Sequence, residues 1–135
     1  MMKKSNQGFT LIELLITIAI IGVLSAAVLI GLNPAQKIAQ ANDSKVKSDV
    51  GQVATAVQTY YTAYQVYPVT GSAGITALVS TSELRVAPST AITYTLSGSN
   101  FSVSGPISAP KTAGNTMWCY RSATGTAIEA TACTP

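Results

Sequence analysis

The chain has 135 residues and a formal net charge of +3, with 47% hydrophobic and only 10% charged residues. This length suits one modest domain and is too short for two cores of ordinary size. Two of the eight basic residues, Lys3 and Lys4, precede a long apolar run. If they are removed with a leader, six basic residues oppose five acidic ones. The charge therefore does not support a nucleic-acid-binding protein, and we predict no specific nucleic-acid partner.

The apolar run from Phe9 to Leu32 contains 24 residues and a single charge, Glu13. As a helix it would be about 36 Å long, which is enough to cross the hydrocarbon core of a bilayer. Because Lys3 and Lys4 lie upstream of the run, the positive-inside tendency predicts a cytoplasmic N-terminus. The C-terminal region would then lie on the outer side of the membrane.

Two cleavage schemes compete at this start. An ordinary secretory signal has a basic start, an apolar stretch of about 7–15 residues and a small-residue cleavage site. Residues 25–27 (Ser-Ala-Ala) offer such a site, but the apolar run continues past them through Val28–Ile30. Glu13 is also out of place in a signal of that kind. The alternative is a cleavage before the run, between Gly8 and Phe9.

The motif behind this alternative is Lys3-Lys4, then Gly8, then the heptapeptide FTLIELL of Phe9–Leu15. It resembles the type IV filament family, which comprises type IV pilins and the pseudopilins of type II secretion. The resemblance implies that a prepilin peptidase cuts after Gly8 and methylates the new amine of Phe9. It also implies a pilin fold of the α+β class. In that fold a long N-terminal helix, part membrane span and part amphipathic, packs on a small antiparallel β-sheet.

Glu13 is the residue that a simple membrane anchor does not explain. A charge at the bilayer centre costs roughly 2.5–3.5 kcal/mol, and less near an interface, so it is normally paired or functional. The resemblance implies a filament core built from these helices. There Glu13 would neutralise the Phe9 amine of a neighbouring subunit and set the register between subunits. A more limited role is to complement the positive end of its own helix, worth about 0.3–1 kcal/mol.

Gly31, Asn33 and Pro34 are predicted to interrupt the helix, because Pro34 lacks an N–H and clashes with the carbonyl of Ile30. A static kink and the partly non-helical segment of assembled filaments in the family both fit this pattern. We expect four parts along the chain: a leader (1–8), a transmembrane and filament-core helix (9–34), an amphipathic half of the helix (35–67) and a globular sheet region with a C-terminal disulfide loop (68–135).

The stretch after Pro34 keeps a helical period but becomes amphipathic. Its apolar residues recur at steps of three and four, which predicts one stripe able to cover a sheet. The stripe consists of Val46, Val50, Val53, Val57, Tyr60, Tyr61 and Tyr64. The charged residues Lys37, Asp43, Lys45, Lys47 and Asp49 are expected to fall mainly off it. Tyr67-Pro68 is expected to end the helix.

The remainder of the chain predicts a connecting segment followed by a small sheet. A short helix is expected over Ile75–Ser80. Alternating apolar and polar residues then predict strands over 92–96, 101–104, 117–120 and 127–130, with a turn at 97–100.

Cys119 and Cys133 are the two cysteines of the chain. An even pair downstream of an export-type segment predicts a disulfide in an oxidising compartment, and two unpaired thiols are the alternative. The chain has no histidine and only scattered acidic residues. We therefore predict no catalytic residue, no metal site and no cofactor. Major pseudopilins commonly bind calcium near the C-terminus, and the acidic residues for that are missing, which favours a pilin.

The leading hypothesis is a structural subunit, not an enzyme, that polymerises into a type IV pilus after cleavage at Gly8–Phe9. Phe9 and Glu13 would act together in assembly. The implied partners are other copies in a helical filament, the prepilin peptidase and methylase, the membrane before assembly, and the inner-membrane platform with its assembly ATPase. The implied location is the inner membrane as a single-pass prepilin, and later the extracellular pilus. The alternatives are a pseudopilin of a type II secretion or DNA-uptake system, and a monomeric anchored or secreted binding domain.

Overall fold

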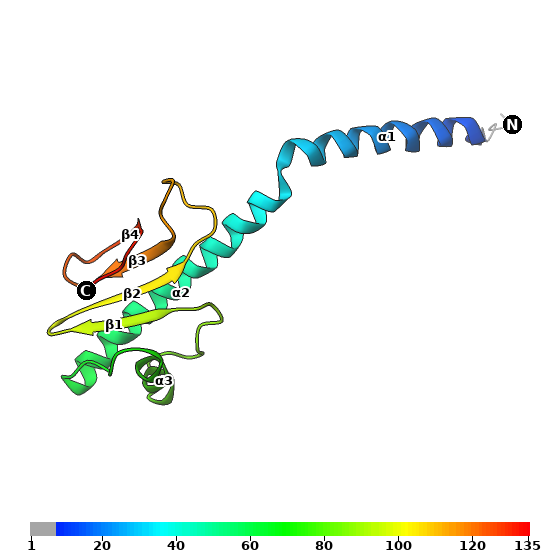
Figure 1. Ribbon diagram of the computed structural model, residues 1–135. Coiled ribbons are helices and arrows are strands. Elements are labelled where there is room, and N and C mark those ends of the chain that lie inside the picture. The colour runs from blue at the N-terminus through cyan, green and yellow to red at the C-terminus, as the bar shows by residue number, and fades with distance from the viewer. Residues whose placement is uncertain (1–7) are drawn as a thin grey trace, which may run out of the picture. The chain divides into compact units, whose positions relative to one another are not determined.

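The computed structural model describes residues 8–135, apart from the side chain of Leu32. Its helices are α1 (Leu11–Leu32), α2 (Pro34–Tyr64) and α3 (Ser72–Ser80), and its strands are β1 (Thr93–Ser97), β2 (Asn100–Pro106), β3 (Met117–Arg121) and β4 (Thr126–Ala130) (Figure 1). The predicted α+β class, with long N-terminal helices followed by an antiparallel sheet, is confirmed. The chain divides into two units, one up to Lys37 and one from Ile38 onward.

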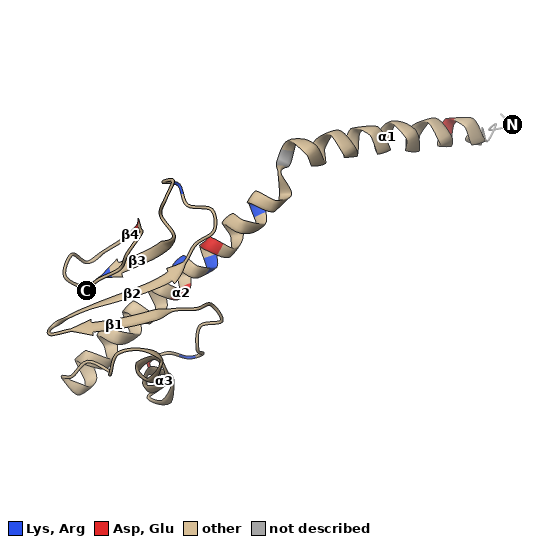
Figure 2. Cartoon of the chain, viewed as in Figure 1, with Lys and Arg blue, Asp and Glu red and all other residues tan. Residues whose placement is uncertain are grey.

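Helix α1 of the first unit is apolar on every side. Its large apolar side chains, from Leu11 to Ile30, are between 51% and 84% exposed. Glu13 is the one charged residue within it (Figure 2). Among residues 8–135, the segment Leu11–Gly31 is the one helical stretch long and apolar enough to cross a membrane. A helix that is apolar all round is covered by lipid or by protein in its working state, because water is a poor solvent for every one of its faces.

The interruption after α1 is a helix end followed directly by a helix start. Asn33 separates the two helices in a left-handed conformation, with φ 42° and ψ 73°. Asn tolerates this conformation better than most residues, since its short polar side chain bonds locally. The Asn33 carbonyl accepts hydrogen bonds from the N–H groups of Gln36 (3.1 Å) and Lys37 (3.3 Å). Pro34 suits the first position of α2, where a missing N–H costs nothing. Gly31 remains inside α1.

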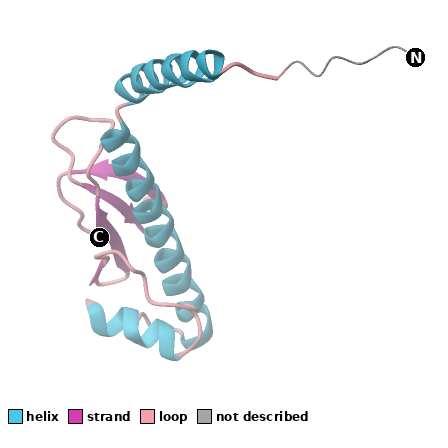
Figure 3. Cartoon of the chain, turned by 90° about the vertical axis from the view of Figure 1, so that its right-hand side faces the viewer, coloured by secondary structure: helices cyan, strands magenta, loops and turns pink. Residues whose placement is uncertain are grey.

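The second unit contains a four-stranded antiparallel sheet in the order β1-β2-β3-β4. The register places Tyr94 opposite Val103, and Val103 opposite Tyr120. Since side chains alternate between the two faces of a strand, these residues share one face. The same alternation adds Leu96, Phe101, Gly105 and Trp118 to it. Helix α2 runs along this face (Figure 3), and its buried residues join the sheet residues in one hydrophobic core.

Helix α2 contacts the sheet through the valines of the predicted stripe. Val46, Val50, Val53 and Val57 are between 0% and 6% exposed. Gly105 on β2 permits this close approach, because a Cβ atom there would lie 2.5 Å from Val46 Cγ1. A larger residue at this point would therefore push the helix away from the sheet.

The prediction that the buried stripe extends to Tyr61 and Tyr64 is wrong. Tyr61 and Tyr64 are 40% and 50% exposed. The Tyr64 ring packs on Tyr60 with centroids 4.5 Å apart, and the Tyr61 ring stacks on Tyr67 at 4.4 Å. These two rings therefore bury surface against other tyrosines and remain accessible. Helix α2 also ends at Tyr64, before the predicted limit at Tyr67, because Gln65 takes a positive φ of 57°.

The segment between α2 and β1 completes the core. Helix α3 begins at Ser72, earlier than the predicted Ile75, and contributes the buried residues Ile75 and Leu78. The Tyr94 hydroxyl donates a hydrogen bond to the Pro68 carbonyl at 3.1 Å. Burial, with a smaller effect of Tyr67, raises the pKa of Tyr94 to about 12. This hydroxyl therefore stays protonated and remains a donor well into the alkaline range.

Gly74 in α3 is a position where one added methyl group should disturb the fold. A Cβ atom there would overlap the Val69 carbonyl oxygen and lie 3.1 Å from Cδ1 of Tyr94. We expect Gly74→Ala to lower the free energy of unfolding by about 1–3 kcal/mol, measured by denaturant titration of the full chain in detergent. Gly51→Ala on α2 is the matched control, because nothing lies within 4 Å of its Cβ position. That variant should gain about 0.5–1 kcal/mol, and equal stability of the two would contradict the packing.

Candidate assembly and processing site

The predicted cleavage positions lie in non-helical backbone ahead of α1. Gly8 has no atom within 4 Å of its Cβ position, and the Phe9 side chain is 83% exposed. Thr10 is extended, with φ −79° and ψ 149°. Exposed, extended backbone is the form that proteases bind. The basic residues Lys3 and Lys4, which the processing motif also includes, lie outside the described residues.

Glu13 forms a reciprocal cap with Thr10 at the start of α1. The Thr10 hydroxyl accepts a hydrogen bond from the Glu13 N–H at 3.3 Å. In return, Glu13 Oε2 accepts from the Thr10 N–H at 2.9 Å and from the Thr10 hydroxyl at 2.8 Å. This capping box satisfies two N–H groups that a helix otherwise leaves without partners. Within the single chain, Glu13 thus serves its own helix, which is the more limited of its two predicted roles.

The predicted pairing of Glu13 with an amine depends on cleavage. In the uncleaved chain the Phe9 nitrogen belongs to a peptide bond and carries no charge. Cutting at Gly8–Phe9 would turn it into an ammonium one residue ahead of the cap. The intersubunit role of Phe9 and Glu13 therefore stays a prediction about the processed, assembled protein.

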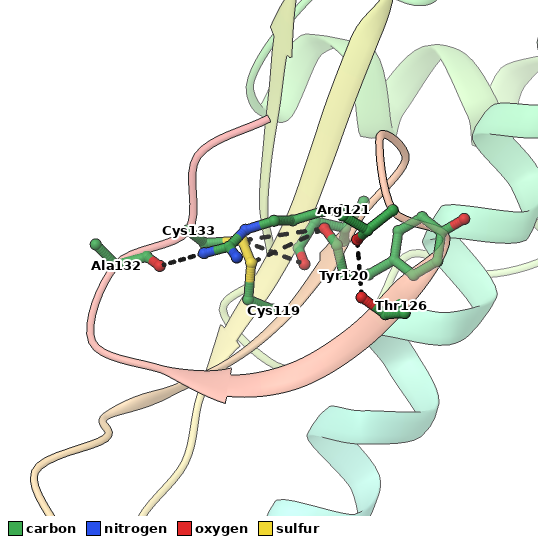
Figure 4. Close-up of a disulfide and its surroundings, with 8 residues drawn as sticks. Cys119, Tyr120, Arg121, Thr126, Ala132 and Cys133 are labelled. Carbon is green, nitrogen blue, oxygen red and sulfur yellow. Dashed lines mark hydrogen bonds between the residues drawn. A yellow bond between two sulfur atoms is a disulfide. The ribbon is translucent and has the colours of Figure 1, made fainter.

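The predicted disulfide between Cys119 and Cys133 is confirmed, with Cα atoms 5.6 Å apart and a sequence separation of 14. Cys119 lies on β3 on the sheet face opposite α2, across from Ser104, and it is fully buried. The Arg121 guanidinium donates to the Ala132 carbonyl at 3.2 Å (Figure 4). The C-terminal residues are thus held at this second face by one covalent bond and one charged donor. Ser102 on the same face is only 2% exposed.

Asp43 is a residue whose predicted environment is wrong. It was expected to fall off the apolar stripe of α2, yet it is only 5% exposed. Its carboxylate accepts hydrogen bonds from the N–H groups of Ser108 and Ala109, each at 2.7 Å. These bonds replace the hydrogen bonds to water that the carboxyl group loses on burial. The helical period could have predicted this burial, since Asp43 lies three residues before Val46 and seven before Val50 and therefore on the same face.

Glu129 on β4 is a second anchor that the sequence did not reveal. Its carboxylate accepts from the N–H groups of Lys111 (2.8 Å) and Thr112 (3.1 Å). Lys47 on α2 completes the arrangement, with its Nζ 3.4 Å from Glu129 Oε1 and 4.4 Å from the Trp118 ring centroid. Two carboxylates therefore hold residues 107–116, the β2–β3 loop. In the part of the chain that the structure describes, no three His, Cys, Asp or Glu side chains group together as a metal site would need.

The comparison with known families agrees with the start of the chain. Residues 3–29 match the family described as the prokaryotic N-terminal methylation motif. The type IV major fimbrial protein FimA of Dichelobacter nodosus is 48% identical over 59 residues, which are 43% of this chain and 36% of FimA. The fimbrial protein EcpC of Eikenella corrodens is 41% identical over 83 residues, 59% of this chain and 52% of EcpC. The chain thus matches between about a third and a half of the length of these relatives.

The matched residues include the start of the chain, whose geometry is described above. The motif family covers the exposed backbone at Gly8 and Phe9, the Thr10–Glu13 cap and most of α1. The remainder of the chain supplies a helix packed on a four-stranded antiparallel sheet. The chain therefore carries the prokaryotic N-terminal methylation motif on a pilin-like α+β fold, and it is similar to type IV fimbrial proteins over the matched segments.

Proposed function

We propose that this chain is the structural subunit of a type IV pilus and that it catalyses no reaction. The observation that carries the proposal is α1, whose apolar side chains are exposed on every side. Such a helix is stable in lipid before assembly, and among identical helices afterwards. The methylation motif over residues 3–29 and the fimbrial relatives support the second of these environments as the final one.

Processing comes first in this proposal. A prepilin peptidase removes residues 1–8 by cutting between Gly8 and Phe9, and the new Phe9 amine is methylated. Residues 9–34 then serve as membrane span and filament core, 35–67 as the amphipathic part and 68–135 as the globular region. The N-terminus lies on the cytoplasmic side until assembly, when an ATPase and a membrane platform move the subunit into the extracellular filament.

Assembly then uses the charges at the start of the processed chain. The Phe9 ammonium and the Glu13 carboxylate would each be costly to bury alone in a helix bundle. Pairing the ammonium of one subunit with the carboxylate of the next offsets both costs and favours one axial register. The break at Asn33 and Pro34 lies at the far end of the apolar segment, two residues after Gly31. It gives the filament core a place where helical structure already stops in the single chain.

Mass spectrometry of the mature protein tests the processing step. Protein purified from surface filaments is expected to begin at a methylated Phe9. Electron microscopy of the same preparation should show thin filaments in which this chain is the dominant protein. A mature start at Ala27 or Val28 would contradict the proposal, because it would indicate an ordinary secretory signal. A correct start without surface filaments would instead favour a pseudopilin.

A further inference from the structure

The β2–β3 loop is held by polar anchors rather than by a core of its own. Ile107, its first residue, is buried, but 111–114 are exposed. Asp43 binds the root of the loop through Ser108 and Ala109. Glu129 binds its outer part through Lys111 and Thr112. Because both anchors are carboxyl groups that accept from consecutive N–H groups, the order of this loop depends on these two acidic side chains.

The hydrogen-bond donors and the charge that face Glu129 in the described structure all favour its ionised form. Trp118 lies opposite it on β3 and is uncharged. Lys47 approaches from α2 with its ammonium 3.4 Å from the carboxylate. Lys111 contributes its N–H, and its side chain lines the same surface hollow as Trp118 and Glu129. A protonated carboxyl would attract the ammonium and the two N–H groups much less strongly, since it has lost its charge.

We propose that Glu129 is an acid-sensitive latch, whose protonation frees residues 110–115 of the β2–β3 loop while the sheet and the disulfide stay formed. The sheet pairing of β3 and β4 runs through backbone bonds that protonation does not alter. The Cys119–Cys133 bond is equally insensitive to acid. Opening is therefore confined to the loop. It would leave Lys47 beside Trp118 and a neutral Glu129, so the opened form presents a cation next to an aromatic ring.

The direction of the pH effect follows from the pKa of Glu129. Burial acts to raise this pKa, but the hydrogen bonds from Thr112, Lys111 and Lys47 and the Lys47 charge outweigh burial, so the pKa lies below its usual range. A depressed pKa means that the carboxylate stabilises the closed loop above the ordinary value of about 4.3, and that this contribution is lost as the pH falls through the lower, folded value. The latch is closed at neutral pH and opens in acid.

Amide NMR of the detergent-solubilised full chain, titrated from about pH 7 to about pH 2, tests this latch. The Lys111 and Thr112 amide proton resonances should shift together, with a midpoint below that of an ordinary Glu. At the acid end their exchange protection, corrected for the intrinsic rate at each pH, should fall about tenfold or more. The Ser108 and Ala109 amides, which bind Asp43 instead of Glu129, serve as the internal reference in the same loop.

Two variants make the test specific. Glu129→Gln should abolish the Lys111 and Thr112 transition and lower their protection already at neutral pH, while the Ser108 and Ala109 amides behave as in the parent chain. Glu83→Gln makes the same chemical change beside Gly51 and Thr55 of α2, and it should leave the Lys111 and Thr112 transition as it is in the parent chain. The proposal is overturned if the transition persists in Glu129→Gln. It is also overturned if the strand amides lose protection at the same pH, since the sheet would then open with the loop.

Discussion

The Glu13→Gln variant should fold and enter the membrane as the parent chain does, yet form filaments at least about a hundredfold less efficiently. Glutamine retains the capping box, because its side-chain oxygen can still accept from the Thr10 N–H. It removes only the negative charge. In the proposed filament core this leaves the Phe9 ammonium of the neighbouring subunit buried without a partner, which costs about 3–5 kcal/mol. Quantitative microscopy and the yield of sheared surface filaments measure the loss.

Thr10→Ala is the matched control for this variant. It removes the hydroxyl that accepts from Glu13 N at 3.3 Å but keeps the carboxylate. If pairing with the amine is the role of Glu13, this variant should lose about 0.5–2 kcal/mol of helix stability and still assemble. If capping is the role, Thr10→Ala should assemble poorly and Glu13→Gln normally. That reversed pattern would remove Glu13 from the assembly mechanism.

Replacing Cys119 and Cys133 together by serine should lower the free energy of unfolding by about 3 kcal/mol, the value that chain entropy gives for a loop of this length. The effect should be local at first, because the C-terminal residues then keep only the Arg121 bond to Ala132 at 3.2 Å. Ser102 and the second face of the sheet would become accessible to water. Denaturant unfolding and hydrogen exchange of the β2 amides measure the two effects.

A chemical reductant provides the control for the double variant. It should destabilise the parent chain by a similar amount and leave the serine variant unchanged. If the serine variant were as stable as the oxidised parent, the disulfide would contribute nothing to the fold. The large effect expected here would then have to be abandoned.

Much of this fold could be predicted, because a helical period and a strand alternation are set by residues that are close in sequence. The period of Val46, Val50, Val53 and Val57 is enough to define a buried helix face. Alternation located the four strands to within a few residues. The exposure of Tyr61 and Tyr64 was harder to predict, since it depends on where the sheet stops. The end of α2 was also harder to predict. Pro68 explains why the helix cannot continue through Tyr67, but not why it already ends at Tyr64.

The anchors of the β2–β3 loop could not be predicted in the same way. Lys47 and Glu129 are 82 residues apart in sequence, and Asp43 is 65 residues from Ser108. A contact of that range depends on the register of four strands and on how α2 lies across them. Glu129 reads in the sequence as a polar residue on an edge strand. The pairing of Trp118 with Glu129 and the contact with Lys47 of α2 show that its side chain faces α2.

The division of the chain into two units also has an evolutionary consequence. The buried residues of the hydrophobic core, from Val46 to Ile107, all belong to the second unit. Helix α1 contributes none of them, so a substitution in α1 does not change the packing of this core. The two parts of the chain are therefore constrained differently, α1 by the lipids and proteins that surround it and the second unit by its own core.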